Sequence, residues 1–256
     1  MLSTVALAER PDFRVLAASC RDDHRGWSAP ETRPDFRLVL VRRGRFRRAV
    51  AAPVDLDPTV GYLGVPGEEE RFAHPAGGDE CTSVSLSAGL GSRLAGAARP
   101  AVYVDARLDL AHRRLLASGP DVDFALVEAL LALLGRFVGV AVAASDDGAL
   151  VARAREALAA DDPAADGLLS LAALLDVSPY RLSRAFTRTL GVSLTRYRNR
   201  LRVGRALDRL SRGEPSLARL AADLGFADQA HLCRTVRAHV GHTPTALRRA
   251  LAAHPG

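Results

Sequence analysis

Several features that define large protein classes are missing from this 256-residue sequence. Three cysteines and a start without a secretory pattern lead us to expect no disulfide framework and a reducing, cytoplasmic location. No run of about 18 uncharged apolar residues occurs, because the most apolar stretch, 122–144, contains Glu128 and Arg136. This excludes a membrane span. The absence of low-complexity tracts, with 48% apolar residues, excludes a disordered chain.

Lysine is also absent, so all 35 basic residues are arginine. Such replacement is typical of a GC-rich genome, and the arginine count alone therefore carries little functional information. The distribution of charge carries more. Residues 1–167 hold 20 Arg and 24 Asp or Glu, a net charge of −4, whereas residues 168–256 hold 15 Arg and 5 acidic residues, a net charge of +10. This segregation indicates a module that binds a polyanion, joined to a part that does not.

The first hundred residues have the pattern of β structure. Short apolar runs are separated by Pro- and Gly-marked turns, which favours a sandwich or small barrel. The expected strands cover 13–20, 36–44, 45–50, 60–65 and 81–87. A first helix is expected at 105–118, and Gly119-Pro120 ends it. A second helix, capped by Asp121 or Asp123, is expected to continue to about Ala143. The second of these helices is apolar almost all round, which predicts burial between layers or against another subunit.

An internal repeat organises the C-terminal part, beyond a polar boundary at 145–148. Residues 171–198 align with residues 220–248, and each copy predicts a short apolar helix, a tight turn and a second helix that ends at glycine. Ser178 and Asp228 are the expected caps of the second helices. This is the layout of a helix-turn-helix, present twice and joined by a connecting helix at about 193–210. A generic helical repeat is the alternative, and the +10 charge argues against it.

These motifs resemble the DNA-binding domain of the AraC/XylS family of transcription regulators, over residues 148–253. The second unit carries the family pattern in Ala221, Gly225-Phe226, Asp228-Gln229, Arg234, Gly241, Pro244 and Arg248. The first unit carries it in Ser178-Pro179, Leu182-Ser183-Arg184, Phe186, Gly191 and Tyr197-Arg198. Leu232, Val236 and Leu247 replace the usual aromatic residues and keep those positions apolar.

The N-terminal part resembles, more loosely, the cupin-like sensor domains that precede this module in the family. The resemblance implies a jelly-roll fold, followed by two helices that often carry a dimer contact. Enzyme-type cupins supply an H-x-H pair for a metal, and this sequence has no H-x-H. The resemblance therefore does not transfer a metal centre.

Helical periodicity places one set of side chains outside each recognition helix. Arginine suits guanine and glutamine suits adenine, whereas basic and hydroxyl side chains also bind phosphate. We expect base contacts from Tyr180, Ser183, Arg184, Gln229, His231 and Arg234. We expect phosphate contacts from Ser178, Arg181, Thr187, Arg188 and Arg237. The alternative for each is a solvated polar residue, and for His231 a role at the helix edge. The arginines of the connecting helix are expected to form salt bridges or phosphate contacts.

The N-terminal part offers two candidate sites, for a small-molecule effector and for a metal ion. Trp27, Arg37, Phe46 and Tyr62 are of the types that line a small-molecule pocket, with core packing as the alternative. Cys20, His24, His74 and Cys81 are metal-ligand types, with Asp79 nearby. Their spacing is not a recognised zinc pattern, although strand pairing would bring the two pairs together. We favour the packing alternative, in which the cysteines are small core residues and the histidines lie in loops.

Together these patterns predict an α+β protein in three parts. Residues 1–104 form the cupin-like effector domain, residues 105–147 a helical connector that dimerises, and residues 148–256 the double helix-turn-helix. The expected function is a sequence-specific transcription regulator under effector control, with double-stranded DNA, a homodimer partner and, for an activator, RNA polymerase as partners. The chain shows no P-loop, Rossmann or Ser/His/Asp pattern. Two alternatives remain: an effector-independent DNA-binding dimer, and a metal-dependent cupin enzyme fused to a DNA reader.

Overall fold

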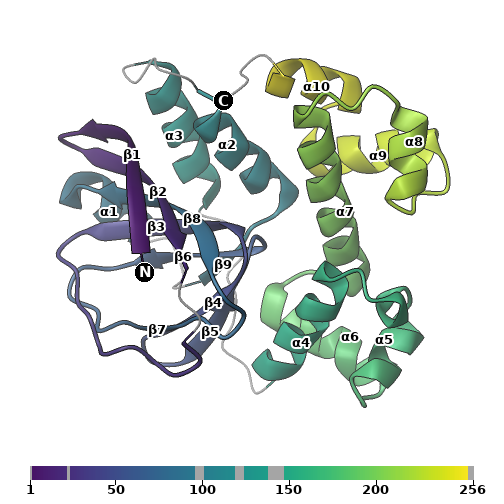
Figure 1. Cartoon of the computed structure of the whole chain (residues 1–256), viewed down its shortest axis with the longest axis horizontal. Helices are drawn as coiled ribbons and strands as arrows, with labels where there is room; N and C mark the ends of the chain where they lie inside the picture. Colours follow the sequence, from purple (N-terminus) through teal and green to yellow (C-terminus); the bar gives the residue numbers. More distant parts are fainter. Residues whose placement is uncertain (1, 22–23, 96–100, 119–123, 138–146, 253–256) are drawn as a thin grey trace. The chain divides into compact units, whose positions relative to one another are not determined.

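The computed structural model describes the chain except for residues 1, 22–23, 96–100, 119–123, 138–146 and 253–256. The chain forms two compact units, and each is described here by itself (Figure 1). Unit 1 comprises Met1–Val104, Val138–Ala157 and Asp162–Gly191, and unit 2 comprises Asp105–Phe137, Leu158–Asp161 and Val192–Gly256. The first helix-turn-helix therefore belongs to unit 1, with the β structure, and the second to unit 2.

Two antiparallel sheets form the β part of unit 1. The larger sheet has the order β1-β2-β8-β3-β6-β9 and the smaller one the order β5-β4-β7. The strands are β1 (Leu2–Arg10), β2 (Phe13–Cys20), β3 (Phe36–Arg43), β4 (Phe46–Ala49), β5 (Pro53–Leu56), β6 (Val60–Gly64), β7 (Arg71–Ala73), β8 (Asp79–Leu86) and β9 (Ala101–Tyr103). Helix α1 (Ala88–Ala95) follows β8. Val15, Leu38 and Val84, from three neighbouring strands, are almost completely buried and anchor the larger sheet.

Unit 1 also contains α4 (Gly148–Ala159, except its last two residues), the 3-10 turn η1 (Pro163–Ala165), α5 (Leu168–Leu174) and α6 (Pro179–Leu190). A buried arginine ties α4 to the strands. The guanidinium of Arg155 lies 2.5 Å from the carboxylate of Asp57 and donates to the backbone oxygen of Asp55 at 3.2 Å. Burial by itself would raise the pKa of Asp57, but the charge of Arg155 and hydrogen bonds from Thr59 outweigh it, so that pKa lies below its usual value.

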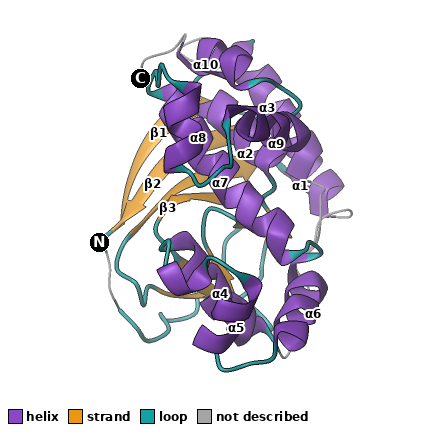
Figure 2. Cartoon of the chain, turned by 90° about the vertical axis from the view of Figure 1, so that its right-hand side faces the viewer, coloured by secondary structure: helices purple, strands orange, loops and turns teal. Residues whose placement is uncertain are grey.

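Unit 2 is built from helices (Figure 2). They are α2 (Ala106–Leu116), α3 (Ala125–Phe137), α7 (Leu194–Ser211), α8 (Leu217–Asp223), α9 (Gln229–Val240) and α10 (Pro244–Ala252). Ala106 and Leu110 of α2 share one apolar core with Leu207 of α7 and with Leu232 and Val236 of α9. Helix α2, which the sequence assigns to a connector, is thus part of the core beneath the second helix-turn-helix.

The predicted α+β class is confirmed: an antiparallel β part is followed by helices, and the C-terminal region is helical throughout its described residues. The expected break and caps at 119–123, the end of the apolar helix beyond Phe137 and residues 145–146 of the expected boundary lie outside the described residues. Among the helices that the structure describes, none has the length and apolar character to cross a membrane.

Candidate nucleic-acid interface

The two repeats form two helix pairs of the same design, α5 with α6 and α8 with α9. Each second helix begins at the predicted cap. The Ser178 hydroxyl accepts a hydrogen bond from the Arg181 amide at 3.2 Å, and the Asp228 carboxylate accepts one from the His231 amide at 2.6 Å. Each also ends at a glycine with a left-handed backbone, φ 70° at Gly191 and 80° at Gly241. The repeat in the sequence is therefore a repeat in structure.

Apolar residues at helical spacing bury one face of each second helix, as periodicity predicts. In α6 the buried residues include Leu182, Ala185, Phe186 and Leu190, all inaccessible to solvent. In α9 they include Leu232, Val236 and Val240. Packing thereby fixes which polar side chains each helix presents outward.

On α6 the outward side chains interact with one another. Tyr180 is 70% exposed, and its hydroxyl accepts a hydrogen bond from the Arg184 guanidinium at 2.7 Å. The same guanidinium lies 5.4 Å from the centre of the Tyr180 ring, a cation–π distance. The Thr187 hydroxyl donates to the backbone oxygen of Ser183 at 3.1 Å. Tyr180 and Arg184 therefore form one exposed, planar, donor-rich group on α6.

Two further arginines of α6 face an acidic residue of the same unit. Arg188 forms a short ion pair with Asp147, the residue before α4, and Arg181 lies 3.8 Å from the other oxygen of that carboxylate. Asp147 is largely buried, whereas both arginine side chains are more than half exposed. An acidic side chain thus already pairs with Arg188 and lies close to Arg181, two of the four residues of this helix region that are expected to contact phosphate.

The outward face of α9 is arranged differently. Gln229, Arg234 and Arg237 are exposed, and none of their side chains has a hydrogen bond or ion pair to another residue that the structure describes. His231 is engaged at the start of the helix: its Nδ1 accepts from the Ala227 amide at 3.3 Å, and its ring meets the Phe226 ring edge-on at 5.4 Å. Helix α9 presents an amide and two guanidinium groups to solvent.

Several arginines of the connecting helix α7 form ion pairs within unit 2. Arg200 is buried and lies 3.2 Å from Asp109, which also pairs with Arg113 at 3.1 Å; Arg113 in turn reaches Asp208 at 2.5 Å. Burial would raise the pKa of Asp109, but the charges of Arg200 and Arg113 more than offset it, so that pKa is lowered. Arg205 forms an ion pair with Asp161. These pairs hold α7 to the rest of unit 2.

The four expected effector-binding residues have separate surroundings in the β part of unit 1. Trp27 is 41% exposed and packs under the Arg47 guanidinium, and Arg37 pairs with Asp35 at 3.2 Å. Phe46 is buried against Phe72 and His74. Tyr62 is buried beneath the guanidinium of Arg48, which is 4.3 Å from its ring centre. Each residue has a packing partner within unit 1.

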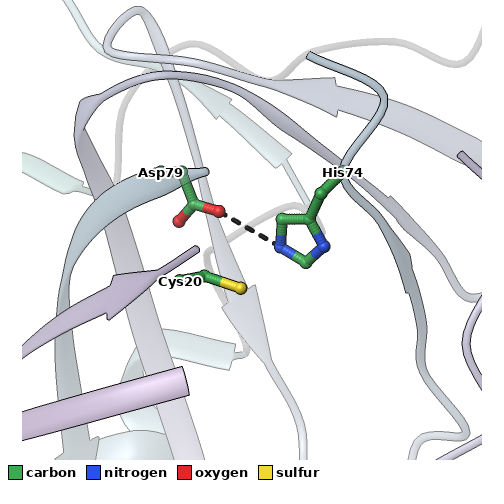
Figure 3. Close-up of side chains that lie close together, drawn as sticks. All are labelled: Cys20, His74 and Asp79. Atoms are coloured by element: carbon green, nitrogen blue, oxygen red, sulfur yellow. Dashed lines mark ion pairs between the residues drawn. The ribbon is translucent and has the colours of Figure 1, made fainter. Parts of the chain in front are cut away.

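The four expected metal-ligand residues lie in one region of the β part of unit 1, and Asp79 lies among them. Ligand atoms of Cys20, His74 and Asp79 all lie within 4.8 Å of one another (Figure 3). The His24 ring contacts the His74 ring at 5.0 Å, and the Cys81 thiol donates to Asp79 at 2.9 Å. Both cysteines are buried and both histidines lie outside the strands, as the packing alternative also requires.

Sequence reasoning missed the acidic partners of Arg188 and Arg200. Asp147 lies 41 residues from Arg188 and Asp109 lies 91 residues from Arg200, so no local pattern links either pair. Asp79 had a weak signal, because it stands two residues before Cys81 and alternate residues of a strand share one face.

Residues 171–250 match a protein family described as a helix-turn-helix domain. Among solved structures, ToxT from Vibrio cholerae O395 is 11% identical, with 94% of this chain and 99% of that one covered and a TM-score of 0.38. The C-terminal domain of AraT, a response regulator from Geobacillus stearothermophilus, is 27% identical over 41% of this chain and 88% of its own, with a TM-score of 0.38. A cupin superfamily protein from Desulfitobacterium hafniense is 18% identical over 34% of this chain and 77% of its own, with a TM-score of 0.28. No curated protein matches the chain in sequence.

Proposed function

Because residues 171–250 form an AraC-type helix-turn-helix domain, we propose that this chain is a sequence-specific, DNA-binding transcription regulator. The observation that carries the proposal is the outward face of α9, where Gln229, Arg234 and Arg237 stand exposed on a helix packed on the opposite side. A recognition helix places such side chains against base edges in the major groove. The net charge of +10 over residues 168–256 supplies the attraction to phosphate.

We assign base reading to both second helices. On α9, Gln229 suits adenine and Arg234 suits guanine, while His231 borders them from the helix start. On α6 the Tyr180–Arg184 group is the base reader, with Ser183 beside it. The phosphate contacts on α6 are Ser178, Arg181, Thr187 and Arg188, and the one on α9 is Arg237.

The length of α7 supports a long site for one chain. Its 18 residues span about 27 Å at about 1.5 Å per residue. Such a connector suits two readers in successive major grooves, whose centres are about 34 Å apart. We propose a site of about 17–20 base pairs with two constrained blocks one helical turn apart. Arg184 governs one block, and Arg234 with Gln229 governs the other.

The remaining parts of the proposal concern regulation. We assign residues 1–104 to effector sensing, residues 105–147 to a homodimer contact and residues 148–256 to DNA binding, in a cytoplasmic, non-enzymatic protein that meets RNA polymerase where it activates. The compact units divide the 148–256 region, since α5 and α6 pack in unit 1 and α8 and α9 in unit 2. DNA-binding experiments therefore need the full chain, because a fragment from residue 148 would leave Arg155 without Asp57.

A binding-selection experiment with the full chain tests the proposal. Arg184→Ala should relax the base preference in one block only, and Arg234→Ala in the other, each at a cost of roughly 1–3 kcal/mol. Arg237→Ala is the matched control: it removes the same charge from α9, and as a phosphate contact it should weaken all sequences about equally. Loss of preference in both blocks, or in neither, after Arg184→Ala would contradict the assignment of α6. Affinity that barely changes with salt would contradict DNA binding through phosphate.

A further inference from the structure

Three ligand-type side chains from distant parts of the sequence meet at one end of the β2–β8 ladder. Cys20 is the last residue of β2, Asp79 is the first residue of β8, and His74 follows β7. Their ligand atoms lie within 4.8 Å of one another (Figure 3). The side chains of His74 and Asp79 are only 12% and 6% exposed, and Cys20 is 9% exposed. The group is therefore a largely buried cluster of one thiol, one imidazole and one carboxylate.

The fold itself places these residues together. Cys20 and Asp79 are direct partners in the antiparallel register of β2 and β8, so their side chains share one face of the sheet. Gly78 allows this approach, because a Cβ atom there would lie 2.2 Å from the backbone oxygen of Cys20. The His74 amide donates to the His24 backbone oxygen at 2.9 Å, and its ring stacks on Phe46 at 5.7 Å. Backbone pairing and ring packing thus hold all three groups in position.

Hydrogen bonding within the cluster is incomplete. The Nε2 atom of His74 lies 3.1 Å from Oδ1 of Asp79. Apart from that contact, neither this Oδ1 nor the Nδ1 atom of His74 has a hydrogen-bond partner among the described residues, although both atoms are buried. Buried polar atoms almost always have partners, and a buried carboxylate needs a positive charge. A bound cation would meet the need of the carboxylate.

We propose that Cys20, His74 and Asp79 bind one divalent transition-metal ion of the zinc class. A thiolate, an imidazole nitrogen and a carboxylate oxygen form a mixed donor set that selects Zn²⁺ or Co²⁺ over Mg²⁺ or Ca²⁺, which prefer oxygen alone. Tetrahedral zinc geometry needs ligand atoms about 3.3–3.8 Å apart, and the ligand atoms of the cluster, all within 4.8 Å of one another, are near enough for one ion to contact all three after side-chain adjustment. Three protein ligands leave one coordination position for water or another ligand.

Cys81 has a supporting role beside the metal ligands. Its thiol donates to Oδ2 of Asp79 at 2.9 Å, which leaves Oδ1 facing His74. The Sγ atom of Cys20, in contrast, is one of the three ligand atoms that lie within 4.8 Å of one another. We therefore assign Cys81 as a positioning residue that orients the carboxylate, and Cys20 as the thiolate ligand.

Cobalt binding to the full-length, reduced, chelator-treated protein tests the site. We expect one Co²⁺ per chain, with tetrahedral d–d absorption and a thiolate-to-cobalt charge-transfer band that Zn²⁺ then displaces. Cys20→Ser should abolish the charge-transfer band, and His74→Gln and Asp79→Asn should each weaken binding by at least about 100-fold. Cys233→Ser is the matched control, since that cysteine lies on α9 in unit 2, and it should bind cobalt like the wild type. Cys81→Ser should keep the charge-transfer band.

The measurement needs no DNA, so its outcome is independent of the proposed function. Circular dichroism in chelator establishes that each variant is folded, and if Cys20→Ser is not, His74→Gln decides the test. Zn²⁺ should raise the melting temperature of the wild type but not that of the ligand variants. The proposal is overturned if the wild type gives no charge-transfer band, if the band survives Cys20→Ser, or if Cys233→Ser removes it.

Discussion

Asp147 makes the two recognition helices unequal. It holds Arg188 in an ion pair and lies close to Arg181, whereas the corresponding basic face of α9 has no acidic partner among the described residues. An exposed guanidinium gains little from such a pair, about 0–1 kcal/mol, but a phosphate must displace the carboxylate before it can bind. We therefore expect α9 to meet phosphate without hindrance and α6 to do so in competition with Asp147.

Removing the charge of Asp147 should strengthen DNA binding. In Asp147→Asn, Arg188 and Arg181 become free for phosphate, so the affinity of the full chain should rise roughly 3–5-fold at low salt. The slope of log affinity against log salt should become more negative by up to about 1–2. Fluorescence anisotropy with labelled duplex DNA over a salt series measures both quantities.

Asp176→Asn provides the control for charge alone. Asp176 is exposed between α5 and α6, and its φ of 55° is one that asparagine tolerates. The same loss of charge there should increase affinity less than Asp147→Asn does. Equal gains from both variants would show that the ion pair with Arg188 has no particular effect on binding.

Among the helices and strands, those with clear signals in their own sequence were predicted correctly. Helices α6, α7 and α9 were predictable within a residue or two, because capping residues, glycines and apolar periodicity all lie within each helix. Strands β1, β5, β7 and β9 were missed: three of them have only 3–4 residues, and β1 is exposed at all but one position, so none shows clear alternation.

In the candidate sites, too, features encoded within one helix were predictable and contacts between distant residues were not. Periodicity predicted which polar residues of α6 and α9 face outward, but nothing local could reveal that Asp147 pairs with Arg188 or that Cys20 pairs in register with Asp79. Those contacts depend on how the chain returns on itself. The expected homodimer contact in 105–147 stays a prediction, and the structure now indicates where to test it.

Helix α3 and the residue before it carry the two most exposed large apolar residues among those described in that segment. Phe124, just before the helix, and Leu131 are 74% and 54% exposed, and a spacing of seven residues places them on one face. Leu130 and Leu134 are buried, so a charge there would disrupt the core instead. We expect Leu131→Glu to convert a dimer to a monomer without loss of helix content, as measured by sedimentation at tens of micromolar.

Leu169→Glu is the matched control, because Leu169 is 73% exposed on α5 and lies outside the expected contact. It should leave the association state unchanged. A wild type that is monomeric at the same concentration would refute the dimer contact.

Across the whole molecule, each unit contains an aspartate held by a buried arginine: Asp57 with Arg155 in unit 1 and Asp109 with Arg200 in unit 2. Both aspartates have a lowered pKa. A carboxylate of this kind contributes its full stabilisation above its unfolded pKa, near about 4, and loses it as pH falls through the lower folded pKa. The free energy of unfolding should therefore hardly depend on these groups from pH 7 to 5 and should fall steeply below about pH 4.

Substituting one of these aspartates should expose that contribution. Asp57→Asn leaves Arg155 buried without its counter-charge, so we expect a loss of roughly 3–5 kcal/mol at pH 7 and a weaker dependence on acid. Urea unfolding at pH 7, 5 and 3.5 measures both effects. Asp55→Asn is the control: its ion pair with Arg47, at 3.6 Å, is partly exposed and should contribute less than about 1 kcal/mol. Equal losses in the two variants would refute the role of the buried pair.

The order in which the chain passes between its two units determines what proteolysis or truncation can separate. The chain leaves unit 1 after Val104, returns at Val138, leaves again after Ala157, returns at Asp162 and leaves finally after Gly191. A single proteolytic nick therefore never yields one intact unit per fragment, because at least one fragment always contains pieces of both. Truncation that removes either reader would therefore also leave a partial core in the remaining chain.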